Sequence, residues 1–229
     1  YTTLFRSLYN DFYPLKNKDL ETKILSMAEE AGIPADHVYE VNMAEKTNAM
    51  NAYVTGIGSN SRIVLWDTTM NKLGEQEILF IMAHEMAHYV EKHIYFGIAL
   101  YLIFGFVGLW MTSKIMNYVI RRWGEALRIP SIKSLSAIPL FLCTISILSF
   151  AASPISNAVS RYEEKRADEY AIAAVGDKEA AIKTFQELSK SSLSQVNPPL
   201  MVKLFRYSHP TMLERSNHID TFEPEEDDD

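Results

Sequence analysis

The chain has 229 residues and a formal net charge of −7, and 48% of its residues are hydrophobic. It contains a single cysteine, Cys143, so it cannot form an intramolecular disulfide and is not a disulfide-stapled secreted domain. No basic stripe with interleaved aromatic residues points to nucleic acid as a partner. Part of the negative charge lies in an acidic tail, residues 223–229, which we expect to be solvated and disordered.

The N-terminal third of the chain predicts a helix followed by strands. Residues 18–34 have helical periodicity, with Asp19 as a plausible N-cap and Gly32 near the end. Short runs rich in β-branched and aromatic residues then predict three strands, at residues 37–43, 51–56 and 61–68. The turn residues 59–61 predict that the last two strands are antiparallel neighbours.

Further helices are predicted on both sides of an apolar middle region. The first covers residues 73–93, with Gly74 at its cap and acidic residues in its first turn. A polar helix from about 157 to 178 and an amphipathic helix over 178–190 follow the apolar region. The rest of the chain, which includes YSHPTMLER, is predicted to be irregular.

Two uncharged stretches in the middle, residues 94–113 and 134–160, are long enough to cross a membrane. A helix rises about 1.5 Å per residue, so roughly 20 residues span a hydrocarbon core of about 30 Å. The competing interpretation is a pair of buried helices in a large soluble core. We expect a transmembrane hairpin with spans of about 94–113 and 135–157. The chain begins at Tyr1 rather than at methionine, which is compatible with an upstream part that holds further membrane helices.

The basic residues near the spans do not set the orientation. The loop between the spans holds five: Lys114, Arg121, Arg122, Arg128 and Lys133. The other side offers as many close to the span ends: Lys92, Arg161, Lys165, Arg166 and Lys178. Because cytoplasmic loops carry the excess of lysine and arginine, equal counts do not favour either orientation. Our working expectation is a cell-membrane protein whose site faces the cytoplasm.

The motif HEMAH, residues 84–88, carries the chemistry. His84 and His88 are four residues apart, so on a helix both imidazoles project from nearly the same face and can reach one Zn²⁺ at about 2.0–2.1 Å. Glu85 lies about 100° around the helix, beside the metal, where it can take a proton from water and pass it to a leaving amine. The motif therefore predicts half of a catalytic zinc site.

A third protein ligand has to come from elsewhere. The pattern HExxHxxGxxH would need a histidine where Ile94 stands, so that option fails. A carboxylate from a later helix is the other option, and Glu164 stands out because Asp168 follows one helical turn later. Glu163 is the fallback ligand. The alternative is that these acids belong to a solvated charged face.

The predicted membrane hairpin favours the ligand interpretation. Two spans return the chain to the side of the membrane that it left, so the helices that carry His84 and Glu164 emerge on the same side and can meet.

The combination of HEMAH, EKRAD (residues 164–168) and YSHP resembles the M48 family of membrane zinc metallopeptidases. NAYVTG followed by SRIVLWDTTM is more similar to the Ste24-like branch of CAAX prenyl endopeptidases than to the HtpX branch. The similarity extends roughly from Val41 to Arg215. Ste24-like enzymes resemble seven-span chambers whereas this sequence shows two predicted spans, so the chamber does not follow from the resemblance. Bacterial relatives generally lack an evident prenylated substrate, so specificity for prenylated substrates does not follow either.

The resemblance implies roles for individual residues. His84, His88 and Glu164 would hold one Zn²⁺ per chain, with Glu85 as the general base. Asp168 would orient a ligand histidine, and His93 would support the site. His209 and Arg215 would approach the metal and could stabilise the oxyanion. The strand segment Asn51, Ala52 and Tyr53 would be the edge on which an extended substrate pairs through its backbone.

We therefore expect an α+β protein: a zincin-like, mainly helical metalloprotease domain with a small sheet, interrupted by a two-helix membrane hairpin. Residues 1–93 and 161–222 would form the two parts of the peptidase domain, with residues 94–160 as the hairpin. The predicted function is an integral-membrane zinc endopeptidase acting on membrane-associated, misfolded or prenylated proteins. Its partners would be a protein or peptide substrate and the lipid bilayer, with the oligomeric state left open. The alternative is a catalytically silent membrane adaptor with a structural zinc site.

Overall fold

The computed structural model describes residues 12–56 and 61–223. The chain divides into two compact units. The first contains Tyr1–His93, Arg161–Pro198 and His209–Asp229, and the second contains Ile94–Ser160 and Pro199–Ser208.

The first unit contains a four-stranded mixed sheet in the order β1-β2-β4-β3. Its strands are β1 (Phe12–Pro14), β2 (Val38–Val41), β3 (Ala52–Thr55) and β4 (Arg62–Trp66). The β3–β4 pair is antiparallel, which confirms that prediction, and residues 59 and 60 of the predicted turn lie outside the described residues. β1 was not predicted, and β2 pairs with β4 in parallel. β3 is therefore an end strand of this sheet.

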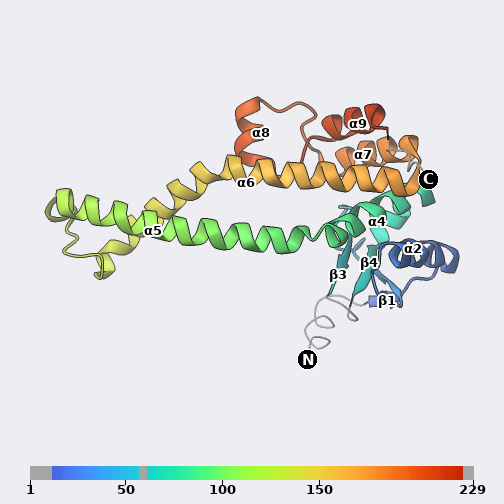
Figure 1. Cartoon of the computed structure of the whole chain (residues 1–229), viewed down its shortest axis with the longest axis horizontal. Helices are drawn as coiled ribbons and strands as arrows, with labels where there is room; N and C mark the ends of the chain where they lie inside the picture. The colour runs from blue at the N-terminus through green and yellow to red at the C-terminus, as the bar shows by residue number, and fades with distance from the viewer. Residues whose placement is uncertain (1–11, 57–60, 224–229) are drawn as a thin grey trace, which may run out of the picture. The chain divides into compact units, whose positions relative to one another are not determined.

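The helices of the first unit pack in two layers around α4. They are α2 (Lys18–Glu30), α3 (Asp67–Lys72), α4 (Glu75–Val90), the second part of α6 (Ile138–Val175), α7 (Lys178–Ser192) and α9 (Met212–Thr221). Figure 1 shows α4 between the sheet with α2 and the layer that contains α6, α7 and α9. The buried side chains follow this layering: Met82 and Met86 belong to the core with the sheet and α2, and Phe80 and Ala83 to the core with α6, α7 and α9. α4 therefore has apolar side chains on the two sides that pack into these cores.

Two local predictions were wrong, each because of a capping side chain. Asn17, not Asp19, is the N-cap of α2, since its side chain accepts a hydrogen bond from the Leu20 amide. The third predicted strand continued to residue 68, but α3 begins at Asp67. The Asp67 carboxylate accepts from the amides of Met43, Ala44 and Thr68, which fixes the end of the strand.

The C-terminal segment was predicted to be irregular, yet it contains α8 (Leu200–Arg206) and α9. Thr211 and Glu214 form a reciprocal capping box at the start of α9. The pattern T-x-x-E is a known helix-start signal, so this helix could have been predicted from the sequence.

The second unit is a hairpin of long apolar helices. α5 (His93–Leu127) and the first part of α6 form its two arms, and a 3-10 turn, Leu135–Ala137, precedes α6 (Figure 1). Both helices are long and apolar enough to cross a membrane. Of the most apolar 18-residue segment of each helix, 0% is buried in α5 and 11% in the helix that includes α6. Such exposure does not fit the alternative of core helices in a soluble domain. α8 packs on the α6 arm, where Phe205 stacks on Phe150 at 4.7 Å between ring centroids.

The mainly helical α+β class with a small mixed sheet and two apolar helices is confirmed. The structural reason is that α2 and α4 supply the buried helical side chains that pack with the sheet, while the two hairpin helices expose apolar side chains such as Tyr101 on α5 and Ile147 on α6.

The ion pair between Glu77 on α4 and Lys183 on α7 leads to a prediction about pH and stability. Burial raises the pKa of Glu77, but Lys183 and backbone amides at the start of α4 outweigh it, so that the pKa is below its usual value. A carboxyl group with a depressed pKa contributes stability above its unfolded pKa of about 4.3, and the contribution is lost as the pH falls through the folded value. We expect Glu77→Gln to lower the melting temperature at pH 7, and the difference from wild type to shrink below about pH 4. Lys183→Met should show the same trend, and a constant difference at all pH values would contradict this.

Candidate metal centre and active site

Both histidines of the HEMAH motif lie on α4, one turn apart, and their rings converge. The Nε2 atoms of His84 and His88 are 3.2 Å from each other. His84 is 7% exposed, and the side chain of His88 is 24% exposed. The predicted helical geometry therefore brings the same ring nitrogen of both residues to one point.

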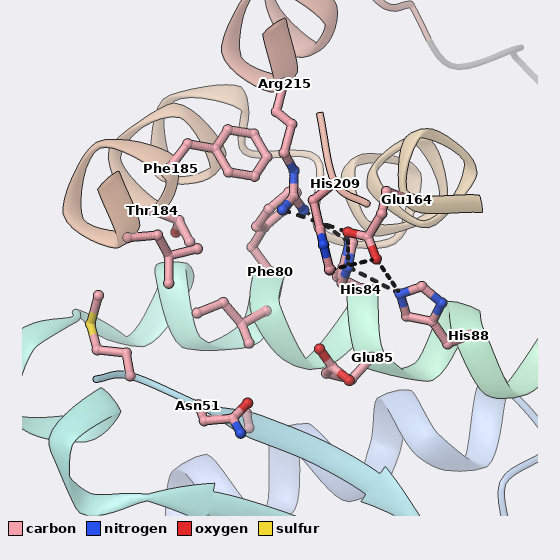
Figure 2. A pocket seen from close by; sticks show the side chains of 14 residues that line it. Asn51, Phe80, His84, Glu85, His88, Glu164, Thr184, Phe185, His209 and Arg215 are labelled. Atoms are coloured by element: carbon pink, nitrogen blue, oxygen red, sulfur yellow. Dashed lines mark hydrogen bonds and ion pairs between the residues drawn. The ribbon is translucent and has the colours of Figure 1, made fainter. Parts of the chain in front are cut away.

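Glu164 on α6 completes the cluster. Its Oε2 lies 3.4 Å from His84 Nε2, and its Oε1 lies 3.5 Å from His88 Nε2. The three ligand atoms of these residues all lie within 4.8 Å of one another, and among the described residues they are the only such group of three or more. The fallback residue, Glu163, is not part of the group. Figure 2 shows Glu164 reaching toward both histidines from a different helix.

The chemistry of this donor set fits a metal cation. When each histidine is protonated on Nδ1, both Nε2 atoms present lone pairs toward the same carboxylate. Glu164 Oε2 is buried, and its polar contacts are long: His84 Nε2 lies at 3.4 Å and Arg215 Nη1 at 3.7 Å. Acceptor atoms that face one another in a buried place repel unless a cation lies among them. Two imidazoles and one carboxylate are a donor set that catalytic zinc sites use.

The buried ion pair between Asp168 and Arg215 contacts His84 on its Nδ1 side, away from Glu164. His84 Nδ1 lies 2.9 Å from Asp168 Oδ1, and Arg215 donates to both Asp168 oxygens at 2.8 and 2.5 Å. Arg215 also lies over the ring of Phe185, 4.5 Å from its centroid. The 3.3 Å approach of Arg215 to His84 Nδ1 is not a hydrogen bond in the Nδ1–H tautomer, because both atoms are then donors. Asp168 thus accepts from both sides and fixes the ring of His84.

The neighbours of each group decide its protonation, because burial opposes every charge in the cluster. For His84, the hydrogen bonds to Asp168 and Glu164 outweigh burial and raise the pKa to about 9. Burial and the charge on His84 lower the pKa of His88 to about 4. Burial raises the pKa of Glu164, but its hydrogen bond with His84 and the nearby positive charges prevail and lower it to about 2. A ligand histidine must be neutral, so metal binding at His84 releases a proton.

Glu85 lies on the next face of α4 and lines a cavity of about 280 Å³. Burial, followed by the charge on Glu164, raises the pKa of the Glu85 carboxyl. The same cavity is lined by the three residues of the cluster (Figure 2). A raised pKa brings a carboxylate closer to neutral pH, where proton transfer by a general base is most efficient.

The structure brings most of the other predicted residues to this cavity. His209, in the loop before α9, lies 3.3 Å from Glu164 Oε1 and is 57% exposed. Asn51 and Ala52 line the cavity, while Tyr53, the next residue on β3, does not. His93 is not part of the ligand group but contacts one of its members, His88, with 2.8 Å between the two Nδ1 atoms.

Several residues of the site were not predicted from the sequence. The apolar part of the cavity comes mainly from α4 and α7, with Phe80, Ile81, Phe185 and Leu188, and from Met50 before β3, while Thr184 on α7 adds a hydroxyl group. The helical periodicity of residues 178–190 was a signal that one face of α7 is buried. Periodicity does not say which surface that face covers, so the residues could not be assigned to the site.

A buried His-His-Glu donor set beside a glutamate that lines the same cavity is the arrangement expected of an HExxH metallopeptidase. The sequence profile of peptidase family M48 matches residues 14–223. The chain therefore belongs to peptidase family M48, which confirms the predicted resemblance.

Individual relatives agree with this assignment. The chain is 58% identical over 213 residues, 93% of its length and 50% of the relative's, to the uncharacterized metalloprotease YhfN of Bacillus subtilis (strain 168). It is 29% identical to CAAX prenyl protease 1 of Saccharomyces cerevisiae, over 93% of this chain and 50% of that protein. The crystal structure of Ste24p from S. mikatae matches with a TM-score of 0.76 and 26% identity, over 96% of this chain and 54% of that one. The chain spans about half the length of these relatives.

The Asp168–Arg215 pair gives a stability prediction for the metal-free chain. Removing one partner of a buried ion pair leaves the other charge buried and unpaired, which costs about 3–5 kcal/mol. We expect Arg215→Met to lower the free energy of unfolding by up to that amount, because Asp168 is 1% exposed and keeps only His84 as a partner among the described residues. The matched control is Lys190→Met, which breaks an exposed pair with Glu187 and should cost about 1 kcal/mol or less. Thermal unfolding in detergent measures both, and equal effects would contradict the prediction.

Proposed function

We propose that this chain carries the catalytic site of a membrane-anchored, zinc-dependent endopeptidase. The observation that supports this most strongly is the convergence of His84, His88 and Glu164 at a cavity that Glu85 also lines. Membership of peptidase family M48 supports peptide-bond hydrolysis as the reaction. A purely structural zinc site is closed and has no use for an unligated acid, so the cavity disfavours a silent adaptor.

In the proposed mechanism His84, His88 and Glu164 hold one zinc ion per chain. When bound, zinc would supply a Lewis acid that polarises the substrate carbonyl and makes water a nucleophile near neutral pH. Glu85 accepts a proton from the attacking water and donates it to the leaving amine. The raised pKa of Glu85 suits both halves of this transfer.

His209 is the proposed donor to the oxyanion that develops on the scissile carbonyl. It is exposed at the cavity and close to Glu164, so it can reach a substrate there. Arg215 was also a candidate for this role. Two of its nitrogens, Nε and Nη2, are directed at Asp168, and Nη1 lies 3.7 Å from Glu164 Oε2. We therefore propose that Arg215 acts mainly as a positioning residue, on His84 through Asp168 and on Glu164 directly.

The substrate would bind in extended form along β3. β3 is an end strand of the described sheet, and Asn51 and Ala52, at its start, line the cavity. A peptide that adds to such an edge gains backbone hydrogen bonds independent of its side chains. This mode suits a protease of broad specificity, acting on membrane-associated or misfolded proteins. Prenylated proteins are also among the proposed substrates, because two relatives are named CAAX prenyl protease 1 and CAAX prenyl protease 1 homolog.

We propose that residues 94–160 are a membrane hairpin inserted between the two parts of the peptidase domain, residues 1–93 and 161–222. The exposed apolar surface of α5 and α6 supports lipid as its environment. The proposed orientation places the site at the cytoplasmic face; the basic residues, equal in number on the two sides of the spans, do not distinguish it from the reverse orientation.

The general-base role predicts the behaviour of Glu85→Gln. The variant keeps the size of the side chain and loses the proton acceptor, so cleavage of an unfolded protein should fall by about 10²–10⁴-fold. Zinc content should stay at that of the wild type, since Glu85 is outside the ligand group. Cleavage at the wild-type rate by the full chain in detergent would refute the mechanism.

The ligand assignment predicts a difference between two adjacent glutamates. Loss of a residue outside the coordination shell weakens metal binding by about 10–100-fold. Glu164 is a proposed ligand, so Glu164→Ala should weaken zinc binding by more than about 100-fold. Glu163→Ala is the matched control and should bind zinc as the wild type does, because Glu163 is not in the ligand group. Chelator competition measures both affinities, and the reverse order would make Glu163 the ligand.

A further inference from the structure

The second ligand histidine, His88, has its own chain of contacts on the side away from the cluster. Its Nδ1 lies 2.8 Å from His93 Nδ1. His93 Nε2 lies 3.1 Å from Glu91 Oε2. Arg166 then donates to Glu91 with Nε at 3.3 Å and Nη2 at 3.0 Å. A continuous series of polar contacts therefore runs from His88 to an arginine on α6.

The proton positions along this series follow from one fixed end. Arg166 has only donors, so Glu91 accepts from it and, as a carboxylate, accepts from His93 as well. His93 therefore carries its proton on Nε2 and, as a neutral ring, has an acceptor at Nδ1. His88 must then donate from its own Nδ1, which leaves the lone pair on Nε2, the atom that faces Glu164. The series selects the tautomer of His88 that a metal ligand needs.

A break in the helix makes this contact possible. In a continuous helix, a residue five positions after His88 lies about 140° around the axis and faces away from it. α4 ends at Val90, however, and Lys92 has a left-handed backbone with φ of 57°. α5 then starts anew at His93, whose ring meets that of His88 with 5.0 Å between centroids.

The Glu91–Arg166 pair also joins the two ligand-bearing helices. Glu91 is the C-cap of α4, three residues after His88, and Arg166 is two residues after Glu164 on α6. The side chain of Arg166 is 49% exposed, so the pair contributes little to global stability. The pair matters more for the orientation of His88, because the donors of Arg166 set the direction of each hydrogen bond from Glu91 through His93 to His88.

We propose that His93, Glu91 and Arg166 are positioning residues that hold His88 in its Nδ1–H tautomer, as Asp168 and Arg215 hold His84. The inference rests on the proposed zinc site. Each ligand histidine then has an acceptor behind it, which in turn is held by an arginine: Asp168 with Arg215, and His93 through Glu91 with Arg166.

Zinc affinity of the purified full chain in detergent, measured by competition with a chelator, tests the proposal. His93→Phe keeps a ring but removes the acceptor, so we expect zinc affinity to fall by about 10–100-fold. His93→Asn keeps an acceptor near the position of Nδ1 and should restore most of that loss. Arg166→Ala should give a smaller loss in the same direction, and Lys165→Ala, its exposed neighbour, should give none.

The melting temperature of the metal-free chain separates positioning from folding. We expect His93→Phe and His93→Asn to melt at similar temperatures while they differ in zinc affinity. Wild-type affinity in His93→Phe, or equal losses in both His93 variants, would overturn the proposal while leaving the proposed function intact. A wild-type chain that binds no zinc would instead refute the proposed function on which the inference rests.

Discussion

The site depends on one constraint: two histidines on a buried helix must both direct Nε2 to the same point. Each can do so only when its other nitrogen donates to an acceptor on the opposite side of the ring. Asp168 is that acceptor for His84, and His93 is in contact with the corresponding nitrogen of His88. The carboxylate of Glu164 closes the cluster, so α6 has to pack against α4 in one register for all of these contacts to form.

The rest of the first unit serves that packing. α4 has apolar side chains in two cores, one with the sheet and α2 and the other with α6, α7 and α9. Together the two cores bury α4, which also carries His84 and His88. Buried polar side chains require hydrogen-bond partners, so these histidines need polar groups from other elements around them. β3, at the end of the sheet, brings Asn51 and Ala52 to the same cavity as Glu85. The architecture thus brings the polar cluster and the start of an end strand to one cavity.

The sequence predicted what depends on local spacing. The four-residue interval of HEMAH placed His84 and His88 on one helix face, and the length of the apolar stretches predicted the two long exposed helices. Spacing left Glu163 and Glu164 as alternatives, since only the packing of α6 decides which of them faces α4. The contact of His93 with His88 required a left-handed break at Lys92 that no composition signal announces. Phe185 and Leu188 line the cavity through tertiary packing that periodicity does not encode.

The central claim is that His84, His88 and Glu164 form one metal centre. X-ray absorption spectroscopy at the zinc edge, on the zinc-loaded full chain in detergent, tests it most directly. We expect nitrogen and oxygen ligands at about 2.0–2.2 Å, with multiple scattering from two imidazoles and no sulfur ligand. A zinc ion with fewer than two imidazoles, or with a sulfur ligand at about 2.3 Å, would contradict it.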